Sequence, residues 1–355
     1  MSAVDVSVLT PVLDEERDLD GVIANMLAQR FDGGVEFLFI DGGSTDRSAD
    51  ILEAWRQRDG RVRVLRNPAR WTPHALNIGL RGARGEFVAR MDAHTHYPET
   101  YLARGVERLR AGDAACVLGP QIAVGEGRWS RRVAFALATP LGVGGARFRK
   151  RLDRDEWEVD TGFTGIWRRD TLLAQGGRHE DFLNDQDTEL AARLRAAGGR
   201  VVCVQDMAAA YIPRNSLRAL SRQYARYGRY RVKTSRLHPE SLRRSQLLPP
   251  ALAVTAASAA VAPRGLRRVA RAGLALYASA LLATSAAAAV REEERRRLAA
   301  SLPVVYATMH FSYGCGFLAG CAREGVPVEA LRHAAVPARP ERPDDQQPPA
   351  PDGRS

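Results

Sequence analysis

The chain has 355 residues, of which 45% are hydrophobic and 26% charged, and its formal net charge is +11. This composition supports a large hydrophobic core and excludes a mainly disordered chain. Lysine occurs only at Lys150 and Lys233, so nearly all of the positive charge is arginine. Anionic membranes and phosphate-bearing substrates fit this charge as well as nucleic acid does. Because the arginines are spread through the chain and concentrate beside apolar segments, we expect no nucleic-acid partner.

The cysteines and the N-terminus bear on the cellular compartment. Cys116, Cys203, Cys315 and Cys321 form no CxxC pair, which argues against a structural zinc site. The N-terminus lacks a basic region followed by a long apolar run, so no signal peptide is expected. We therefore expect the N-terminal region and its thiols to lie in the cytosol.

Residues 5–120 alternate between short apolar runs and amphipathic stretches. The apolar runs predict strands at Val6–Leu13, Val35–Ile40, Val62–Leu65, Phe87–Met91 and Ala115–Leu118. Helix starts are predicted at Ser44–Asp46 and at Thr72, which is followed by proline at the first helical position. Strands alternating with helices of this length predict an α/β fold with a mostly parallel sheet flanked by helices.

From residue 121 to 240 the pattern is less regular. It predicts a helix over Asp187–Ala197, a strand over Val201–Val204 and a long helix over Ser216–Leu237. The long helix carries six arginines, one lysine and three tyrosines. Such a composition is typical of a basic helix at a membrane interface, here residues 215–238.

Three apolar, alanine-rich segments follow, at Leu247–Ala262, Ala272–Val290 and Leu302–Ala319. The middle segment is 19 residues long without a charge, close to the roughly 20 that span a bilayer. We expect residues 245–322 to form membrane-associated helices. Two crossings, three crossings, an interfacial arrangement and a soluble helical bundle all stay open, and arginines on both sides of each segment leave the orientation open. The tail, residues 337–355, is predicted to be disordered.

Acidic residues stand where the predicted strands end. Asp14 and Glu15 follow the first strand, Asp41 ends the second and Asp92 ends the fourth, while Asp187 opens a helix. Ligands of open α/β sheets bind outside the carboxyl ends of the strands, so these side chains converge on one crevice. A cluster of carboxylates is costly without a cation, which implies a bound divalent metal.

Five short motifs occur in an order that resembles family 2 glycosyltransferases. They are Thr10–Glu15, Phe39–Asp46, Arg90–His94, Asn184–Leu190 and Gln223–Tyr227. Within that family the chain looks most like bacterial enzymes of succinoglycan-type exopolysaccharide assembly, which share the Asp-Ala-His variant and a C-terminal run like His310–Phe317. The resemblance covers about residues 5–320. It implies the GT-A fold, a Rossmann-like mostly parallel sheet, for a catalytic domain over residues 1–240 with a C-terminal hydrophobic helical membrane region.

The resemblance also implies a donor site for a UDP- or GDP-sugar. Its residues would be Pro11, Glu15, Asp41, Gly43 and Asp92. Asp41 would accept a hydrogen bond from the base, although by itself an aspartate at a strand end is more ordinarily part of an Asx-turn.

A divalent metal, Mn²⁺ or Mg²⁺, would bind at Asp92 and bridge the diphosphate. His94 stands where the family commonly has a second aspartate. It could ligate the metal, and imidazole suits Mn²⁺ better than Mg²⁺. Equally, it could orient Asp92 or a water.

Asp187 is the implied general base, which takes a proton from the acceptor hydroxyl. The family's Glu-Asp pair appears here as Gln186-Asp187, and Asp185 is the alternative base if the register slips. An ordinary interpretation of these acids is that they complement the helix dipole.

On the acceptor side the resemblance implies Gln223, Arg226 and Tyr227, which could equally belong to an interfacial helix. Trp167 would offer a stacking surface there, although a packed core tryptophan is the more ordinary interpretation.

The expected function is metal-dependent, inverting transfer of a hexose from a nucleotide sugar to a lipid-linked saccharide acceptor in surface-glycan synthesis. The expected location is the cytoplasmic membrane, with the catalytic domain facing the cytosol. One alternative is transfer directly to polyprenyl phosphate. Another is a non-catalytic nucleotide-binding membrane scaffold, against which the joint presence of Asp41, Asp92 and Asp187 argues.

Overall fold

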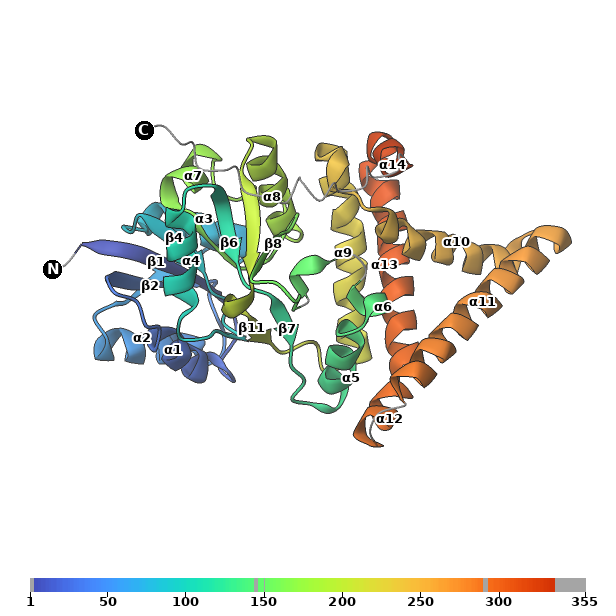
Figure 1. Cartoon of the computed structure of the whole chain (residues 1–355), viewed down its shortest axis with the longest axis horizontal. Coiled ribbons are helices and arrows are strands. Elements are labelled where there is room, and N and C mark those ends of the chain that lie inside the picture. The colour runs from blue at the N-terminus through green and yellow to red at the C-terminus, as the bar shows by residue number, and fades with distance from the viewer. Residues whose placement is uncertain (1–2, 144–145, 150, 290–292, 336–355) are drawn as a thin grey trace, which may run out of the picture.

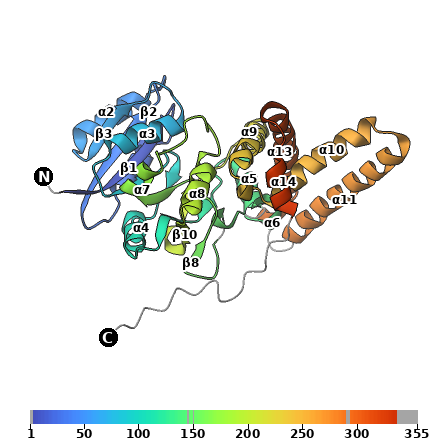
Figure 2. The ribbon, with the colours of Figure 1, turned by 90° about the horizontal axis from the view of Figure 1, so that it is seen from above.

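A computed structural model describes residues 3–143, 146–149, 151–289 and 293–335. The strands gather at one end of the molecule, and long helices form the other end (Figures 1 and 2). The predicted tail, 337–355, lies outside the described residues. The candidate site lies where these two ends meet.

The main sheet has eight strands in the order β3-β2-β1-β4-β9-β6-β10-β8. In chain order they are β1 (Val4–Val12), β2 (Gly34–Asp41), β3 (Val62–Arg66), β4 (Phe87–Arg90), β6 (Ala114–Leu118), β8 (Glu156–Glu158), β9 (Gly165–Arg168) and β10 (Arg200–Val204). Strands β1 to β4 pair in parallel, as do β6 and β10, while β8 and β9 run antiparallel to their neighbours. The predicted mostly parallel sheet is confirmed.

Helices cover both faces of this sheet. They are α1 (Leu19–Leu27), α2 (Ser48–Arg58), α3 (Thr72–Gly82), α4 (Tyr101–Arg110), α7 (Arg169–Ala174) and α8 (Gln186–Ala196). Adjacent residues of a strand point to opposite faces. Val8 accordingly packs in a core with Ile23 of α1, and Leu9 packs in another core with Leu76 of α3. Burial on both faces explains why Phe37–Ile40 in β2 is a continuous apolar run instead of an alternating one.

Two predicted helix starts are displaced. Residues 44–46 do not begin a helix, because their side chains and amides bond to the loop after β1, and α2 begins only at Ser48. In α3, Trp71 is the capping residue, so Thr72 is the first helical residue and Pro73 the second. Sequence signals for capping were therefore right about the neighbourhood and wrong about the residue.

A second, three-stranded sheet joins distant segments. It consists of β5 (Thr95–His96), β11 (Ala209–Tyr211) and β7 (Gln121–Ala123), in the order β5-β11-β7. Tyr211 pairs with Thr95. The chain that leads into the long helix α9 is thereby fixed beside the loop that follows β4.

Two long helices, α9 (Leu217–Leu237) and α13 (Leu302–Glu324), pack against each other at short range. A Cβ added at Gly228 of α9 would collide with the Tyr313 carbonyl, and one added at Gly316 of α13 would collide with the Ala225 carbonyl. Glycines such as these two let helix backbones approach closely. Ser216 caps α9 by accepting a hydrogen bond from the Ala219 amide at 3.1 Å, close to the predicted start.

Beyond α13, the hairpin of α10 (Leu248–Val261) and α11 (Arg264–Ala288) projects on the side away from the strands (Figures 1 and 2). The remaining helices are short: α5 (Arg128–Leu137), α6 (Pro140–Val143), α12 (Glu293–Ala299) and α14 (Val328–Ala335). Among the described helices, only α11 is long and apolar enough to cross a membrane, judged by length and composition alone. The expected two or three crossings therefore stay a prediction. Helix α13, the last of the three apolar segments, buries Val305, Tyr306 and Met309 inside the molecule.

Candidate active site

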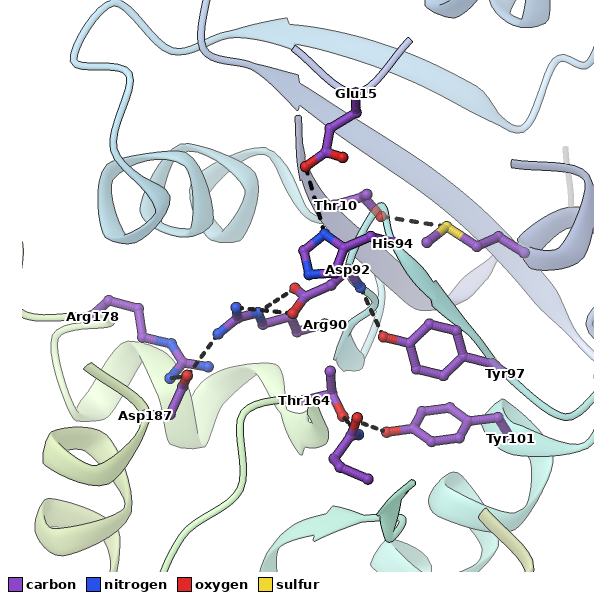
Figure 3. Close-up of polar contacts among 12 residues, drawn as sticks. Thr10, Glu15, Arg90, Asp92, His94, Tyr97, Tyr101, Thr164, Arg178 and Asp187 are labelled. Carbon is purple, nitrogen blue, oxygen red and sulfur yellow. Dashed lines mark hydrogen bonds and ion pairs between the residues drawn. The ribbon is translucent and has the colours of Figure 1, made fainter. Parts of the chain in front are cut away.

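The predicted acidic residues do meet at one edge of the sheet. Strands β1, β2 and β4 are parallel neighbours, so the loops that follow them lie side by side. The N-terminus of α8 approaches the same edge (Figure 3). Asp92 and Asp187, which are 95 residues apart in the sequence, come together there through Arg90.

The loops after β1 and β2 are tied to each other. Asp41 accepts hydrogen bonds from the amides of Gly43 and Ser44, both at 3.1 Å. This is the Asx-turn that a lone aspartate predicts, and Gly43 has a positive φ of 77°. Asp14, at φ 54°, accepts from the Thr45 amide at 2.7 Å. The nucleoside role expected for Asp41 would share its carboxylate with this turn.

Asp92 is a buried carboxylate that forms an ion pair with Arg90. Arg90 Nε lies 2.7 Å from Asp92 Oδ1, and Arg90 Nη2 lies 3.2 Å from Oδ2. The Asp92 amide donates to the hydroxyl oxygen of Tyr97 at 2.8 Å. Charge-assisted bonds of this kind fix the direction of the carboxylate. The turn after β4 is therefore rigid around Asp92.

Arg90 also reaches the predicted general base. Its Nη1 lies 2.7 Å from Asp187 Oδ1, and Nη1 of Arg178 lies 2.8 Å from the same oxygen. Burial raises the pKa of Asp187 above that of a free aspartate, although Arg90 and Arg178 oppose the shift. Sequence reasoning missed both arginines as site residues. Arg90 could have been noticed inside its motif, whereas Arg178 lies in no motif.

Asp185, the alternative base, is occupied by α9. It has a left-handed backbone at φ 64°. Its carboxylate accepts from Arg231 Nη2 at 2.8 Å, Thr234 Oγ1 at 2.6 Å and Thr188 Oγ1 at 2.9 Å. A carboxylate with three such donors is poorly placed to take a further proton. The geometry therefore favours Asp187 over Asp185 as the base.

His94 faces Glu15 across the edge. Its Nδ1 lies 3.5 Å from Glu15 Oε1 (Figure 3). Partial burial lowers the pKa of His94, but the hydrogen bond to Glu15 and the charge of Asp92 outweigh it, so the pKa is raised above the usual value. Two residues predicted for different tasks, donor binding and metal binding, thus contact each other.

The donor set fits a divalent cation only together with a diphosphate. The described residues contain no group of three or more His, Cys, Asp or Glu side chains able to hold a metal. The protein would supply the carboxylate of Asp92 and the imidazole of His94, the latter only when deprotonated. Mg²⁺ and similar ions commonly take one or two protein ligands and complete their shell with substrate phosphates and water, so two groups suffice.

Trp167 does not line the acceptor side as expected. Its side chain on β9 is packed in the core with Leu9 and Leu172 and has 4% of its surface exposed, and Arg178 lies over its ring at 5.0 Å. A buried ring offers no open face for a sugar to stack on. Trp167 instead supports Arg178, which holds Asp187.

The expected acceptor residues Gln223, Arg226 and Tyr227 lie on α9. Gln223 Nε2 donates to the Tyr227 hydroxyl at 2.9 Å, and Arg226 is exposed. A further arginine that the sequence did not single out, Arg149, lies over the Tyr211 ring at 5.6 Å. Because Tyr211 pairs with Thr95 of β5, Tyr211 and Arg149 lie near the loop that carries His94.

Comparisons with known proteins agree with this geometry. The sequence model "Glycosyl transferase family 2" matches residues 7–172. The succinoglycan biosynthesis protein ExoA of Rhizobium meliloti is 32% identical over 257 residues, which are 72% of this chain and 77% of that protein. An undecaprenyl-phosphate 4-deoxy-4-formamido-L-arabinose transferase of Pseudomonas aeruginosa is 35% identical over 111 residues, 30% of this chain and 33% of that one.

Among solved structures, the mannosyltransferase of Pyrobaculum calidifontis, in complex with GDP-mannose and Mn²⁺, superimposes with a TM-score of 0.59. It is 21% identical, and the match covers 89% of this chain and 86% of that one. This likeness shows a shared fold. The family model and the Rhizobium relative, not the solved structure, establish that the chain belongs to glycosyltransferase family 2 and is a glycosyltransferase.

Proposed function

We propose that the protein transfers a hexose, with inversion, from a UDP- or GDP-sugar to a lipid-linked saccharide in surface-glycan synthesis. One observation carries this proposal: Arg90 joins Asp92 and the base candidate Asp187 at the carboxyl edge of the sheet. A metal-binding group and a base are needed on the two sides of a sugar being transferred. Here a single buried guanidinium sets their separation.

The donor would bind along the loops after β1 and β2. Pro11, Glu15, Asp41 and Gly43 would hold the nucleoside. Strand β1 tolerates a proline at position 11 because its pairing with β4 already ends at Leu9. Asp92 and His94 would hold a divalent cation against the diphosphate. When bound, the cation neutralises the charge that develops on the leaving diphosphate.

Asp187 would act on the acceptor. Its carboxylate would accept the proton of the attacking hydroxyl. A general base works best when its pKa is near the pH at which the enzyme operates, and burial raises the pKa of Asp187 in that direction. Arg90 and Arg178 hold one of its oxygens, which leaves the other to face the acceptor. These arginines therefore orient the base without preventing proton transfer.

The lipid-linked acceptor is supported by the Rhizobium relative, whose name places it in succinoglycan biosynthesis. Gln223, Arg226 and Tyr227 on α9 would contact that acceptor, and the enzyme would work at the cytoplasmic membrane facing the cytosol. The Pseudomonas relative favours a second candidate, transfer directly to a polyprenyl phosphate, because its name contains that acceptor.

The test uses the detergent-purified full chain with a panel of UDP- and GDP-sugars in Mn²⁺, Mg²⁺ or EDTA. Each donor is offered polyprenyl phosphate or a polyprenyl-diphosphate-linked saccharide. We expect metal-dependent transfer to the saccharide that is lost in Asp92→Ala and kept in Asp181→Ala, a change at an exposed residue. Transfer to polyprenyl phosphate alone would support the second candidate. Binding of a donor without transfer to either acceptor would support the non-catalytic nucleotide-binding scaffold, and no binding of any donor would contradict the proposed transferase.

The role of His94 has its own test. If it ligates the cation, Mn²⁺ should support faster transfer than Mg²⁺, and His94→Asp should shift the preference toward Mg²⁺. Equal rates with both metals and no shift in the variant would instead mean that His94 does not ligate the cation and orients Asp92 or a water.

A further inference from the structure

The apolar C-terminal helices differ in what covers them. On α13, Val305, Tyr306 and Met309 are fully buried against neighbouring helices. On α11, Val269 and Leu276 are 69% and 73% exposed, although they are equally apolar. Nothing among the described residues covers them. Helix α13 exposes Val304 and Leu318 only in part, so the α10–α11 hairpin presents the larger share of the exposed apolar side chains at this end of the molecule.

The first half of α11 has two opposite sides. Arg264, Arg268 and Arg271 recur at spacings of four and three, which puts them on one side of a helix. Leu266, Val269 and Leu276, at spacings of three and seven, share the opposite side and are each at least half exposed. At 3.6 residues per turn the mean directions of the two sets lie roughly 145° apart.

The packing direction of α11 lies between these two sides. Ala270 and Leu281 are the buried apolar residues of α11, and α11 packs on α10 and α13. Helix α11 therefore has one basic and one apolar flank, and its contacts with α10 and α13 lie between these two flanks. A helix with arginines on one flank and leucine and valine on the other is suited to lie in the plane of a membrane interface.

Helix α11, with 25 residues, is long enough to cross a bilayer, but α10 is not. Helix α10 has 14 residues, which at 1.5 Å per residue span about 21 Å, against a hydrocarbon core of about 30 Å. The arginines stand at the turn between α10 and α11. A hairpin inserted end-on would thus place its charged tip inside the hydrocarbon, where each arginine costs about 2.5–3.5 kcal/mol or more.

We propose that the α10–α11 hairpin lies along the surface of a bilayer that contains anionic phospholipid. Its Leu266–Val269–Leu276 flank enters the boundary between headgroups and acyl chains, and its arginine flank binds the lipid phosphates. Charge complementarity selects this occupant: an apolar partner protein would leave the arginines unmatched. The inference rests on the membrane location in the proposed function but not on the sugar transfer.

Vesicle flotation of the full chain tests the lipid contact. We expect the protein to float with phosphatidylcholine vesicles that contain phosphatidylglycerol and to stay behind with phosphatidylcholine alone. Replacing Arg264, Arg268 and Arg271 together by glutamine should weaken binding on the order of a hundredfold at low salt, since each arginine near an anionic surface contributes roughly fivefold.

The matched control removes the same charge elsewhere. Arg58, Arg81 and Arg195 are exposed arginines of the catalytic domain, and the triple change to glutamine should alter binding little. An equal loss in both triple variants would overturn the specific role of the hairpin. Light scattering that shows a dimer, abolished by Leu276→Ser, without vesicle binding would assign the apolar flank to a second copy instead.

Labelling with a membrane-impermeant maleimide tests the in-plane geometry. Gly265→Cys at the hairpin tip is compared with Gly60→Cys in the catalytic domain, both at glycines where an added Cβ meets no atom within 4 Å, with Cys315 and Cys321 changed to serine. In sealed membrane vesicles, both cysteines should react from the same side. Reaction of the two from opposite sides would show a crossing and overturn the proposal. Transfer activity is not measured in either assay, so failure here leaves the proposed reaction standing.

Discussion

The catalytic sheet and the C-terminal helices meet at two aspartates that are two residues apart. Asp187 is held by Arg90 and Arg178, which extend from the sheet region. Asp185 is held by Arg231 and Thr234 of α9. Of these two aspartates, Asp187 is thus the base candidate and Asp185 is a structural anchor. The difference comes from which donors surround each carboxylate.

The anchor has a consequence for the base. Because the left-handed Asp185 precedes α8 directly, the contacts to α9 set the start of the helix that carries Asp187. A second link, 3.4 Å from His238 Nε2 to Glu189 Oε1, joins the same helix to the end of α9. The helices at the C-terminal end therefore position the base, and the following predictions test this division of roles.

The largest expected effect is on Asp187. Asp187→Asn keeps the size of the side chain but cannot accept the proton, so kcat should fall about 10²- to 10⁴-fold. Steady-state transfer assays with a fixed donor measure it. A rate within tenfold of the wild type would remove Asp187 from the role of base, and an equal loss in Asp185→Asn with unchanged stability would point to Asp185.

Asp185→Ala should act first on stability. It leaves the mostly buried Arg231 without its carboxylate, so the free energy of unfolding should fall by about 3 kcal/mol. Urea denaturation followed by circular dichroism measures the change. Asp181→Ala, at an exposed position of the same loop, is the control and should be near neutral. Equal stabilities of the two variants would contradict the anchor role.

Glycine substitutions compare the packed helix with the exposed one. Gly316→Ala on α13 places a Cβ against the Ala225 carbonyl, so we expect a loss of about 1–3 kcal/mol through overpacking. Gly273→Ala on α11 meets only Thr255 Cγ2 at 3.6 Å and should stabilise the helix by up to about 1 kcal/mol. Thermal unfolding measures both, and shifts of the same sign would break the comparison.

The smallest expected effect is a displacement of the pH profile. Burial raises the pKa of Asp187, and the protonated acid cannot accept a proton. The acid limb of kcat/KM should therefore lie at higher pH than the titration of a free aspartate, near 3.9. Activity rises as the pH rises through this limb. A limb at or below the value of free aspartate would show that Asp187 is not the titrating group.

Much of the sheet was predictable because its strands are buried on both faces. Val35–Ile40 was expected and β2 extends over Gly34–Asp41, since the apolar run Phe37–Ile40 is typical of a strand buried on both faces. Asp92 and Asp187 were predicted from motifs, and the structure brings them to one edge. The helix start at Ser44–Asp46 failed because Asp14 accepts a hydrogen bond from the Thr45 amide and Asp46 accepts one from the Glu16 amide, which ties the two loops together. Such a contact has no local sequence signal.

The sequence by itself determined the α/β class, the edge of the sheet that carries the site and the family. These follow from periodicity and from short motifs whose residues are close together in the chain. Only the tertiary structure decided that Arg178 holds Asp187, that Asp185 belongs to α9 and that Trp167 is buried. It also decided that α13 is covered while α11 is open. Burial and ion pairing depend on which distant segments meet, and the apolar content of a helix does not say which of its side chains another segment covers.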